Sequence, residues 1–260
     1  MDEPLVRWDI ADGVATVVLD SPHNRNALSR RLLSELAGAL DTVTRHPDAR
    51  VIVLTGAGTV FCSGADLKEQ REANETGSHT QPINTLPAIL TTLWTCPQPV
   101  VCQLNGPARA GGVGLLASCD LVVAPAEVTF SFTEVRLGLV PAIITVPLLR
   151  RIAPQALHRL FLTAEVFSAE RAQEIGLVDV VAATGELYAE VARVVAMLLR
   201  GGPQAMVLTK RLVPEIRALS PQEAFTRLTT LSAERFASAE GREGMQAFAE
   251  KRDPAWVPTA

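Results

Sequence analysis

The sequence has no large surplus of charge of either sign. Its 260 residues contain 24 Lys and Arg against 28 Asp and Glu, a formal net charge of −4. This balance argues against a protein that binds nucleic acid through the phosphate backbone, because such proteins carry a basic patch. The longest apolar run, residues 139–149, contains two prolines and is too short to cross a bilayer, so no membrane partner is expected.

Signatures of metal and nucleophile catalysis are missing as well. The four cysteines match no zinc-ligand spacing and are interpreted as small buried hydrophobic residues, so no metal is expected. None of the four histidines lies in an H-E-x-x-H pattern, and no serine lies in a G-x-S-x-G pattern. The first residues, MDEPLVRWDI, lack the basic and apolar pattern of a secretion signal, which predicts a cytoplasmic location.

What the chain does contain is an alternation of strands and helices. Short apolar runs predict buried strands, and the segment after Ser29 predicts an amphipathic helix. The expected strands are residues 5–10, 14–19, 51–56, 99–106 and 120–124. This order predicts an α/β core over residues 1–198, followed by a helical region over residues 199–260. Within that helical region we expect a hinge near Glu240 and Gly241.

The segment AGGVGLLASCD, residues 110–120, holds three glycines within four positions. It fits the G-x-G-x-x-G/A pattern of dinucleotide-binding proteins, but too few residues separate Gly114 from the next expected strand for the long helix of that fold. Two interpretations stay open: a tight turn, or a backbone that presents free N–H groups to an anion. A second candidate of the same kind is FCSGADLK, residues 61–68, where Gly64 precedes an expected helix.

These two segments, taken with others in the same order, resemble the crotonase (enoyl-CoA hydratase/isomerase) superfamily. The similar segments cover nearly the whole chain and include NRNALS, VIVLTGAGTVFCSGADLKE, PVVCQLNGPARAGGVGLLASCDLVVA, FSFTEVRLGLVP, LTAEVFSAERAQEIGLVDVV and EGREGMQAFAEKRDPAW. The resemblance implies a crotonase-like spiral of ββα units, a C-terminal helical trimerisation region, and a homotrimer or a dimer of trimers. It also implies an acyl-CoA thioester substrate, with no cofactor beyond the coenzyme A that the substrate carries.

The resemblance assigns roles to residues at matching positions. The backbone N–H groups of Ser63 and Gly111 would form an oxyanion hole, which stabilises the enolate charge on the thioester oxygen. Glu134 would move protons at the carbon beside the thioester, rather than form an ordinary salt bridge with Arg136. The other implied contacts are to the substrate: Arg25 and Lys68 near the CoA phosphates, and the backbone of Ala65, Asp66 and Leu67 near the adenine.

Gly114 departs from the pattern of most hydratases in this family. They usually carry a second glutamate three residues beyond the oxyanion glycine, and that position here is Gly114. With Glu134 as the remaining acid, we expect an enoyl-CoA hydratase-like enzyme that adds water reversibly to a 2-enoyl-CoA. The alternatives are a Δ3,Δ2-enoyl-CoA isomerase with Glu134 as its single base, and a non-catalytic acyl-CoA binding protein.

A narrower resemblance points to fatty acid metabolism and branched-chain catabolism. GGVGLLASCDLVVA and FTEVRLGLVPAIITVPLLRRI resemble hydratases of the methylglutaconyl-CoA and carboxygeranoyl-CoA type. PAIIT replaces the PGAGGT turn of straight-chain hydratases, so Ile143 and Ile144 either reshape the acyl pocket or belong to a helix core. Substrates of that branch carry a distal carboxylate, for which Arg109 is a candidate partner. The alternatives for Arg109 are a surface position or a contact with a CoA phosphate.

Overall fold

The computed structural model describes residues 3–76, 85–217 and 219–258, and its strands form two sheets. In the larger sheet β1 and β2 pair antiparallel, and every further pair of neighbours is parallel. In order across that sheet, its strands are β1 (Val6–Ala11), β2 (Val14–Leu19), β3 (Val51–Gly56), β4 (Val100–Gln103), β6 (Leu121–Pro125) and β9 (Val180–Ala182). The smaller sheet consists of β5 (Ala108–Arg109), β7 (Thr129–Ser131) and β8 (Phe167–Ser168).

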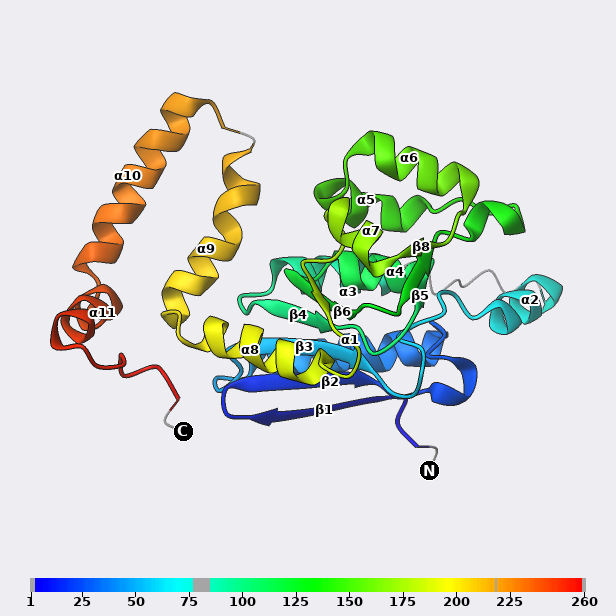
Figure 1. Ribbon diagram of the computed structural model, residues 1–260, viewed down its shortest axis with the longest axis horizontal. Helices are drawn as coiled ribbons and strands as arrows, with labels where there is room; N and C mark the ends of the chain where they lie inside the picture. Colours follow the sequence, from blue (N-terminus) through cyan, green and yellow to red (C-terminus); the bar gives the residue numbers. More distant parts are fainter. Residues whose placement is uncertain (1–2, 77–84, 218, 259–260) are drawn as a thin grey trace.

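Helices surround the two sheets and continue beyond them (Figure 1). Those within the first part of the chain are α1 (Arg30–Arg45), α2 (Leu67–Thr76), α3 (Thr85–Thr95), α4 (Gly111–Ala117), α5 (Ala142–Arg151), α6 (Pro154–Thr163), α7 (Ala169–Glu174) and α8 (Leu187–Leu199). The remaining helices are α9 (Pro203–Ile216), α10 (Pro221–Ala237) and α11 (Ala239–Glu250). Two short 3-10 turns, η1 (Pro22–Asn24) and η3 (Glu134–Leu137), lie in loops.

Successive segments of the chain follow the same path through both sheets. β4 lies in the larger sheet, β5 lies in the smaller one, and α4 follows; β6, β7 and α5 repeat this order. Between β3 and α2 the path is the same, with an isolated parallel bridge from Cys62 to Ala108 in place of a second strand. The expected spiral of ββα units is therefore confirmed.

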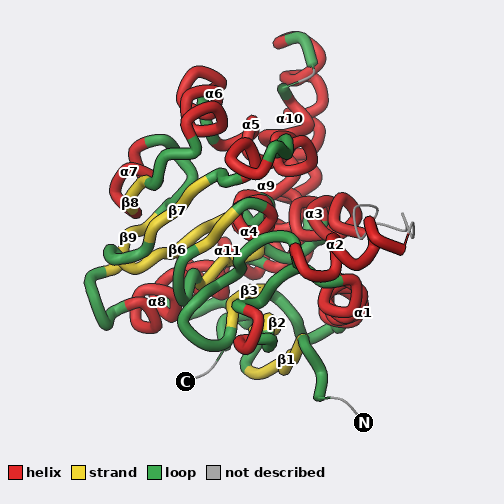
Figure 2. Tube along the Cα trace, turned by 90° about the vertical axis from the view of Figure 1, so that its right-hand side faces the viewer, coloured by secondary structure: helices red, strands yellow, loops and turns green. Residues whose placement is uncertain are grey.

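The larger sheet is covered on both faces, which explains why its strands are apolar throughout. Along β3, Val51 and Val53 pack in one apolar cluster with α8, whereas Ile52 and Leu54 pack in the other, with α1 and α3. Successive side chains of a strand point to opposite faces, so this alternation follows from the backbone. Figure 2 shows α8 and α1 on opposite sides of the strands. The packing of helices on both faces of the larger sheet thus accounts for the interior, and the loops at the strand ends are not needed to form it.

The C-terminal helices extend to one side of the sheets in Figure 1. α8 ends at Leu199 and α9 begins at Pro203. The predicted division of the chain into a core, residues 1–198, and a helical region, residues 199–260, stays a prediction. The two predicted C-terminal helices are confirmed, and the break between α10 and α11 lies at Ser238, two residues before the predicted hinge near Glu240 and Gly241. The Ser238 hydroxyl accepts the N–H of Gly241 at 2.9 Å and so starts α11 there.

Candidate active site

Two loops meet beyond the carboxyl ends of β3 and β4. These strands are parallel neighbours, so the segments that follow them, residues 61–68 and 108–114, leave the same edge of the sheet. A Cβ placed on Gly64 would lie 3.4 Å from the N atom of Gly111, and one placed on Gly111 would lie 3.8 Å from the Cα of Gly64. Gly64 also has a φ of +90°, which residues with a side chain rarely adopt. The loops therefore pack backbone against backbone.

The backbone amide of Ser63, which we predicted as an oxyanion donor, is hydrogen-bonded within the protein. Its N–H donates to the carbonyl oxygen of Arg25 at 3.1 Å, so this amide is not free to hold an oxyanion. Ala65, two residues further on, is exposed, and its N–H finds no acceptor within the described part of the chain. Ala65 therefore offers an exposed, unpaired amide in this loop, within the described residues. Nothing in the local sequence signals this, because the Arg25 carbonyl belongs to a distant loop.

The facing loop contributes the amide of Gly111, the first residue of α4. N–H groups in the first turn of a helix lack an acceptor within the helix. Val113 and Gly114 donate to the carbonyl oxygen of Ala110 at 2.9 and 3.3 Å, whereas no acceptor for Gly111 N–H lies among the described residues. Ala110 itself has φ 46° and ψ −119°, a strained conformation of the kind that clusters at functional sites. Ala65 and Gly111 thus present two unpaired amides from touching loops.

Glu134 follows β7 of the smaller sheet, and Gly111 follows the neighbouring strand β5. β5 and β7 pair parallel with Arg109 opposite Ser131, and Gly111 and Glu134 each follow shortly after these strands end. The Oε2 atom of Glu134 is buried and has no hydrogen-bond partner among the described residues, and no ion pair joins Glu134 to Arg136 there. Burial raises the pKa of the Glu134 carboxyl, and a hydrogen bond from its own backbone opposes this in part. An uncommitted carboxyl oxygen therefore follows β7, next to the strand that leads to the Gly111 amide.

The raised pKa of Glu134 predicts a pH-dependent cost to folding. Because burial favours the neutral carboxyl, the protonated Glu134 side chain contributes to the stability of the fold. This contribution is fully present below the ordinary glutamate pKa of 4.5, and it is lost as the pH rises through the higher pKa that Glu134 has in the folded protein. Glu134→Gln is neutral at every pH, so its Tm should exceed that of the wild type at neutral pH, and the gain should vanish below pH 4.5. Thermal melting across this range, with the exposed Glu127→Gln as control, measures the effect. An equal difference at all pH values would contradict it.

The place of a second carboxylate is filled by a core side chain. A Cβ placed on Gly114 would lie 2.5 Å from Cγ2 of Ile144 and 3.1 Å from its Cβ. Ile144 lies in α5 with 3% of its surface exposed, so the helix-core interpretation holds for it. Ile143 is partly buried against the same core. Any side chain at position 114 must therefore displace Ile144 before it reaches the site.

This packing predicts that Gly114→Ala destabilises the fold. A β-branched side chain has few alternative rotamers, so the overpacking should cost about 1–3 kcal/mol in the free energy of unfolding. Ile144→Ala removes the clashing Cγ2, and the double variant should lose less stability than the sum of the two single changes. Urea denaturation measures all three.

A matched control comes from Gly38 in α1. It is exposed, and a Cβ there would meet nothing within 4 Å. Gly38→Ala should therefore raise stability by up to about 1 kcal/mol, as alanine does in a helix interior. Equal effects of alanine at positions 38 and 114 would show that Ile144 does not constrain Gly114.

The predicted CoA contacts lie together on one accessible surface. The hydrogen bond from Ser63 N–H to the Arg25 carbonyl oxygen holds the loop after η1 against the segment that leads into residues 65–68. Asp66 precedes α2 and caps its first turn, because its Oδ1 accepts the N–H of Lys68 at 3.0 Å. The exposed members of this set are Arg25, Ala65, Leu67 and Lys68. Their contacts with CoA stay a prediction.

Arg109 is held by the smaller sheet. One terminal nitrogen donates to the carbonyl oxygens of Ala108, at 2.9 Å, and of Thr129, and the other donates to Thr129 Oγ1 at 2.9 Å. Burial lowers the pKa of the Arg109 guanidinium. These bonds tie β5 to β7, so the side chain supports the loop that carries Gly111. Its contact with a substrate carboxylate stays a prediction.

Other sequence expectations concern cysteine and helices. All four cysteines are free and buried, which confirms them as small core residues. Burial raises the pKa of the Cys62 thiol to about 12, and a backbone hydrogen bond opposes this.

No group of three or more His, Cys, Asp or Glu is placed to hold a metal ion among the residues that the structure covers. In the same residues no single helix has the length and hydropathy to span a membrane; α8 and α9 meet that test only as a joined pair, bent by 104°.

Within the described residues, the fold and these loops define a class: a ββα-spiral protein with unpaired amides at Ala65 and Gly111 and a partly buried, unpartnered carboxyl group at Glu134. The family model described as enoyl-CoA hydratase/isomerase matches residues 9–258. The chain belongs to this family and is an enzyme of it.

Similar proteins span nearly the full length of the chain. A Thermus thermophilus relative is 34% identical over 93% of this chain and 96% of its own. Enoyl-CoA hydratase EchA19 of Mycobacterium tuberculosis is 31% identical, over 92% of this chain and 91% of its own. The solved structure of Pseudomonas aeruginosa AtuE has a TM-score of 0.91 at 30% identity, covering 97% of this chain and 99% of that protein. These likenesses confirm the expected crotonase fold.

Proposed function

We propose that the enzyme adds water reversibly to a 2-enoyl-CoA thioester, with Glu134 as the acid and base. The observation that carries this proposal is the buried Oε2 of Glu134, which has no partner within the described residues. Glu134 follows β7, the parallel neighbour of the strand that leads to the unpaired Gly111 amide. A buried polar atom without a partner is costly, and a bound water or substrate would satisfy it.

The proposed reaction proceeds through an enolate. The amides of Ala65 and Gly111 hold the thioester oxygen, which gains charge as water adds to the β-carbon. The Glu134 carboxylate takes a proton from that water, and the C–O bond forms while the enolate develops. Glu134 then returns the proton to the α-carbon, which restores the thioester and the free carboxylate. One carboxyl group suffices because it acts in both steps.

The rest of the proposal concerns how the enzyme contacts the CoA part and the acyl part of its substrate. The exposed side chains of Arg25 and Lys68 would meet the CoA phosphates, and the backbone of 65–67 would meet the adenine. No separate cofactor is required, since coenzyme A is part of the substrate. We extend the proposal to a cytoplasmic location and to branched acyl groups whose distal carboxylate would meet Arg109.

One observation favours a second candidate, a Δ3,Δ2-enoyl-CoA isomerase. Because Ile144 fills the space beside Gly114, an apolar side chain lies where a second carboxylate would hold water. A single base that moves one proton between two carbons needs no water at all. In that case Glu134 removes a proton from the α-carbon and returns it to the γ-carbon.

The test is a panel of straight and branched acyl-CoA substrates in isotope-labelled water. Hydration predicts loss of the conjugated thioester absorbance and a mass gain of one labelled water. Isomerisation predicts a gain of conjugated absorbance from a 3-enoyl-CoA without labelled oxygen. If tight acyl-CoA binding occurs with neither change, both proposals fail and a binding role remains.

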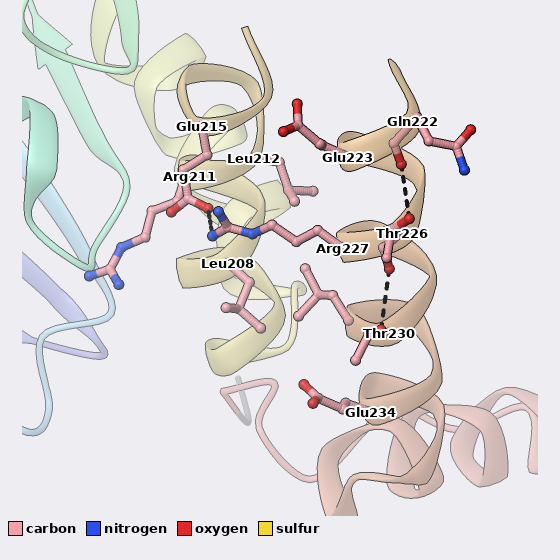
Figure 3. Close-up of a pocket in the computed structure, with 11 residues that line it drawn as sticks. Leu208, Arg211, Leu212, Glu215, Gln222, Glu223, Thr226, Arg227, Thr230 and Glu234 are labelled. Atoms are coloured by element: carbon pink, nitrogen blue, oxygen red, sulfur yellow. Dashed lines mark hydrogen bonds and ion pairs between the residues drawn. The ribbon is translucent and has the colours of Figure 1, made fainter. Parts of the chain in front are cut away.

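We also propose that the protein is a homotrimer or a dimer of trimers, assembled through the C-terminal helices. Figure 3 shows Arg227 of α10 reaching Glu215 of α9 across a cleft of about 710 Å³, with Leu208 and Leu212 along its wall. Further along, α10 and α11 leave Phe236 66% and Phe248 87% exposed. Such apolar surface is typical of an interface.

Light scattering tests the assembly. The expected mass is three or six times the chain mass of 27.8 kDa, and Phe248→Glu should reduce it. Tyr188→Glu in α8, where the side chain is 71% exposed, is the control that should leave the mass unchanged. A monomer at micromolar concentration would refute the proposal.

A further inference from the structure

A second cavity lies at the opposite ends of the helices that shape the candidate active site. It measures about 540 Å³, a size typical of small-molecule sites, and is lined by the last residues of α4 and α5 together with α3 and α9. Gly111 begins α4 and Ser118 follows its end, so the length of that helix, about 10 Å, separates the two places. Ile144 packs on Gly114 near the start of α5, whereas Arg150 lines the cavity near its end.

The lining of this cavity is strongly basic in a chain of net charge −4. The charged residues are Arg150, Arg151, Lys210, Arg217 and a single acid, Asp120. Lys210 is neutralised, because its Nζ lies 2.8 Å from Asp120 Oδ2 and its side chain is 7% exposed. Arg151 is likewise occupied, by Asp179 and by the carbonyl oxygen of Cys119 at 2.8 Å.

Two arginines of the cavity form no ion pair within the part of the chain that the structure describes. Neither Arg150 nor Arg217 forms an ion pair with any described residue, although both line the cavity. The guanidinium of Arg150 lies 3.2 Å from the ring centroid of Trp94, which fixes it over an aromatic face. Burial lowers the pKa of Arg150 to about 10; Asp120 opposes this, and the nearby charges of Arg151 and Arg217 add to it. Arg150 therefore stays charged at neutral pH beside other cations, an arrangement that an anion would stabilise.

Apolar side chains form another part of the lining. Trp94, Val213 and Pro214 share the cavity with the two unpaired arginines. We propose that this cavity binds a small organic phosphate, whose phosphate groups contact Arg150 and Arg217 and whose organic part packs on the apolar wall. Arginine suits this role, because its planar donors bind phosphate oxygens in pairs. The proposal is independent of the reaction assigned to Glu134.

Calorimetric titration of the full-length protein with ADP and with inorganic pyrophosphate tests the proposal. We expect one saturable site per chain for pyrophosphate, and ADP should bind this cavity more tightly because it also contacts the apolar wall. Quenching or enhancement of Trp94 fluorescence should follow pyrophosphate binding and disappear in Trp94→Phe. The double variant Arg150→Gln, Arg217→Gln should weaken binding at least about tenfold, as expected for the loss of charge-assisted hydrogen bonds.

Two control variants separate this cavity from other sites. Arg45→Gln with Arg193→Gln removes two exposed arginines elsewhere, paired with Asp41 and Glu190, and should leave binding unchanged. Arg25→Gln with Lys68→Gln alters the proposed CoA contacts and should also leave it unchanged. If only this second pair weakens binding, the anion occupies the acyl-CoA site and the proposal is wrong.

Three further results would also overturn it. The first is no saturation at millimolar concentrations of either probe. The second is equal weakening by the Arg150 and Arg217 pair and by the Arg45 and Arg193 pair, which indicates general charge attraction. The third is a fall in the mass measured by light scattering when Arg150 and Arg217 are replaced, because a partner chain then supplies the counter-charges.

Discussion

Glu134→Gln should lower the rate of enoyl-CoA turnover by about 10²–10⁴-fold and leave acyl-CoA binding intact. Glutamine keeps the shape of the side chain and removes its ability to take up and return a proton. The loss should appear in kcat rather than in the binding constant, because the change affects proton transfer and not the CoA contacts. Stopped-flow absorbance for turnover and calorimetry for a non-reacting acyl-CoA measure the two quantities separately.

Glu127→Gln serves as the matched control for this prediction. Glu127 is exposed and accepts a hydrogen bond from Thr184 at 3.1 Å, which the glutamine oxygen can still accept. Its turnover should equal that of the wild type. If Glu134→Gln retains more than a tenth of the wild-type kcat, the proton must be moved by another group, and the proposed mechanism fails.

Most of the fold could be predicted from the sequence because its signals are local. The apolar run 51–56 coincides with β3, and Ser29 caps α1 by accepting the N–H of Leu32, as its position before the amphipathic helix indicates. The break between the two C-terminal helices lies two residues before the predicted hinge, for an equally local reason. Glycine at 241 suggests a break, but the capping bond of Ser238 places that glycine inside the first turn of α11.

The site was less accessible to prediction because its details depend on distant contacts. Glu134 and Gly111 stand out through their motifs. The choice between Ser63 and Ala65, in contrast, depends on the carbonyl of Arg25, which reaches this loop only after folding. The pairing of Gly114 with Ile144 is similar, since the residue that fills the space of the missing side chain lies thirty positions further along the chain. Close packing of the interior links such positions, and no sequence period reveals them.

The amide assignment leads to a second large effect on rate. Replacing the Ala65 peptide N–H by an ester oxygen, through incorporation of the matching hydroxy acid, removes one proposed oxyanion donor and keeps the side chain. Loss of one such donor typically lowers kcat by about 10²–10³-fold. The same replacement at Ser63 removes only the bond to Arg25, so it should cost about 0.5–1.5 kcal/mol of stability and leave kcat nearly unchanged.

The two esters are closely matched controls for one another. Each also weakens the carbonyl group that precedes it, and both carbonyls accept an amide: Gly64 O from Leu28 at 2.8 Å, and Cys62 O from Arg109 at 3.0 Å. Any difference in kcat therefore reports on the N–H that was removed. If the Ser63 ester loses activity and the Ala65 ester does not, Ser63 must exchange its bond to Arg25 for the thioester oxygen when substrate binds. Loss of activity in neither would show that the charge on the thioester oxygen is stabilised elsewhere.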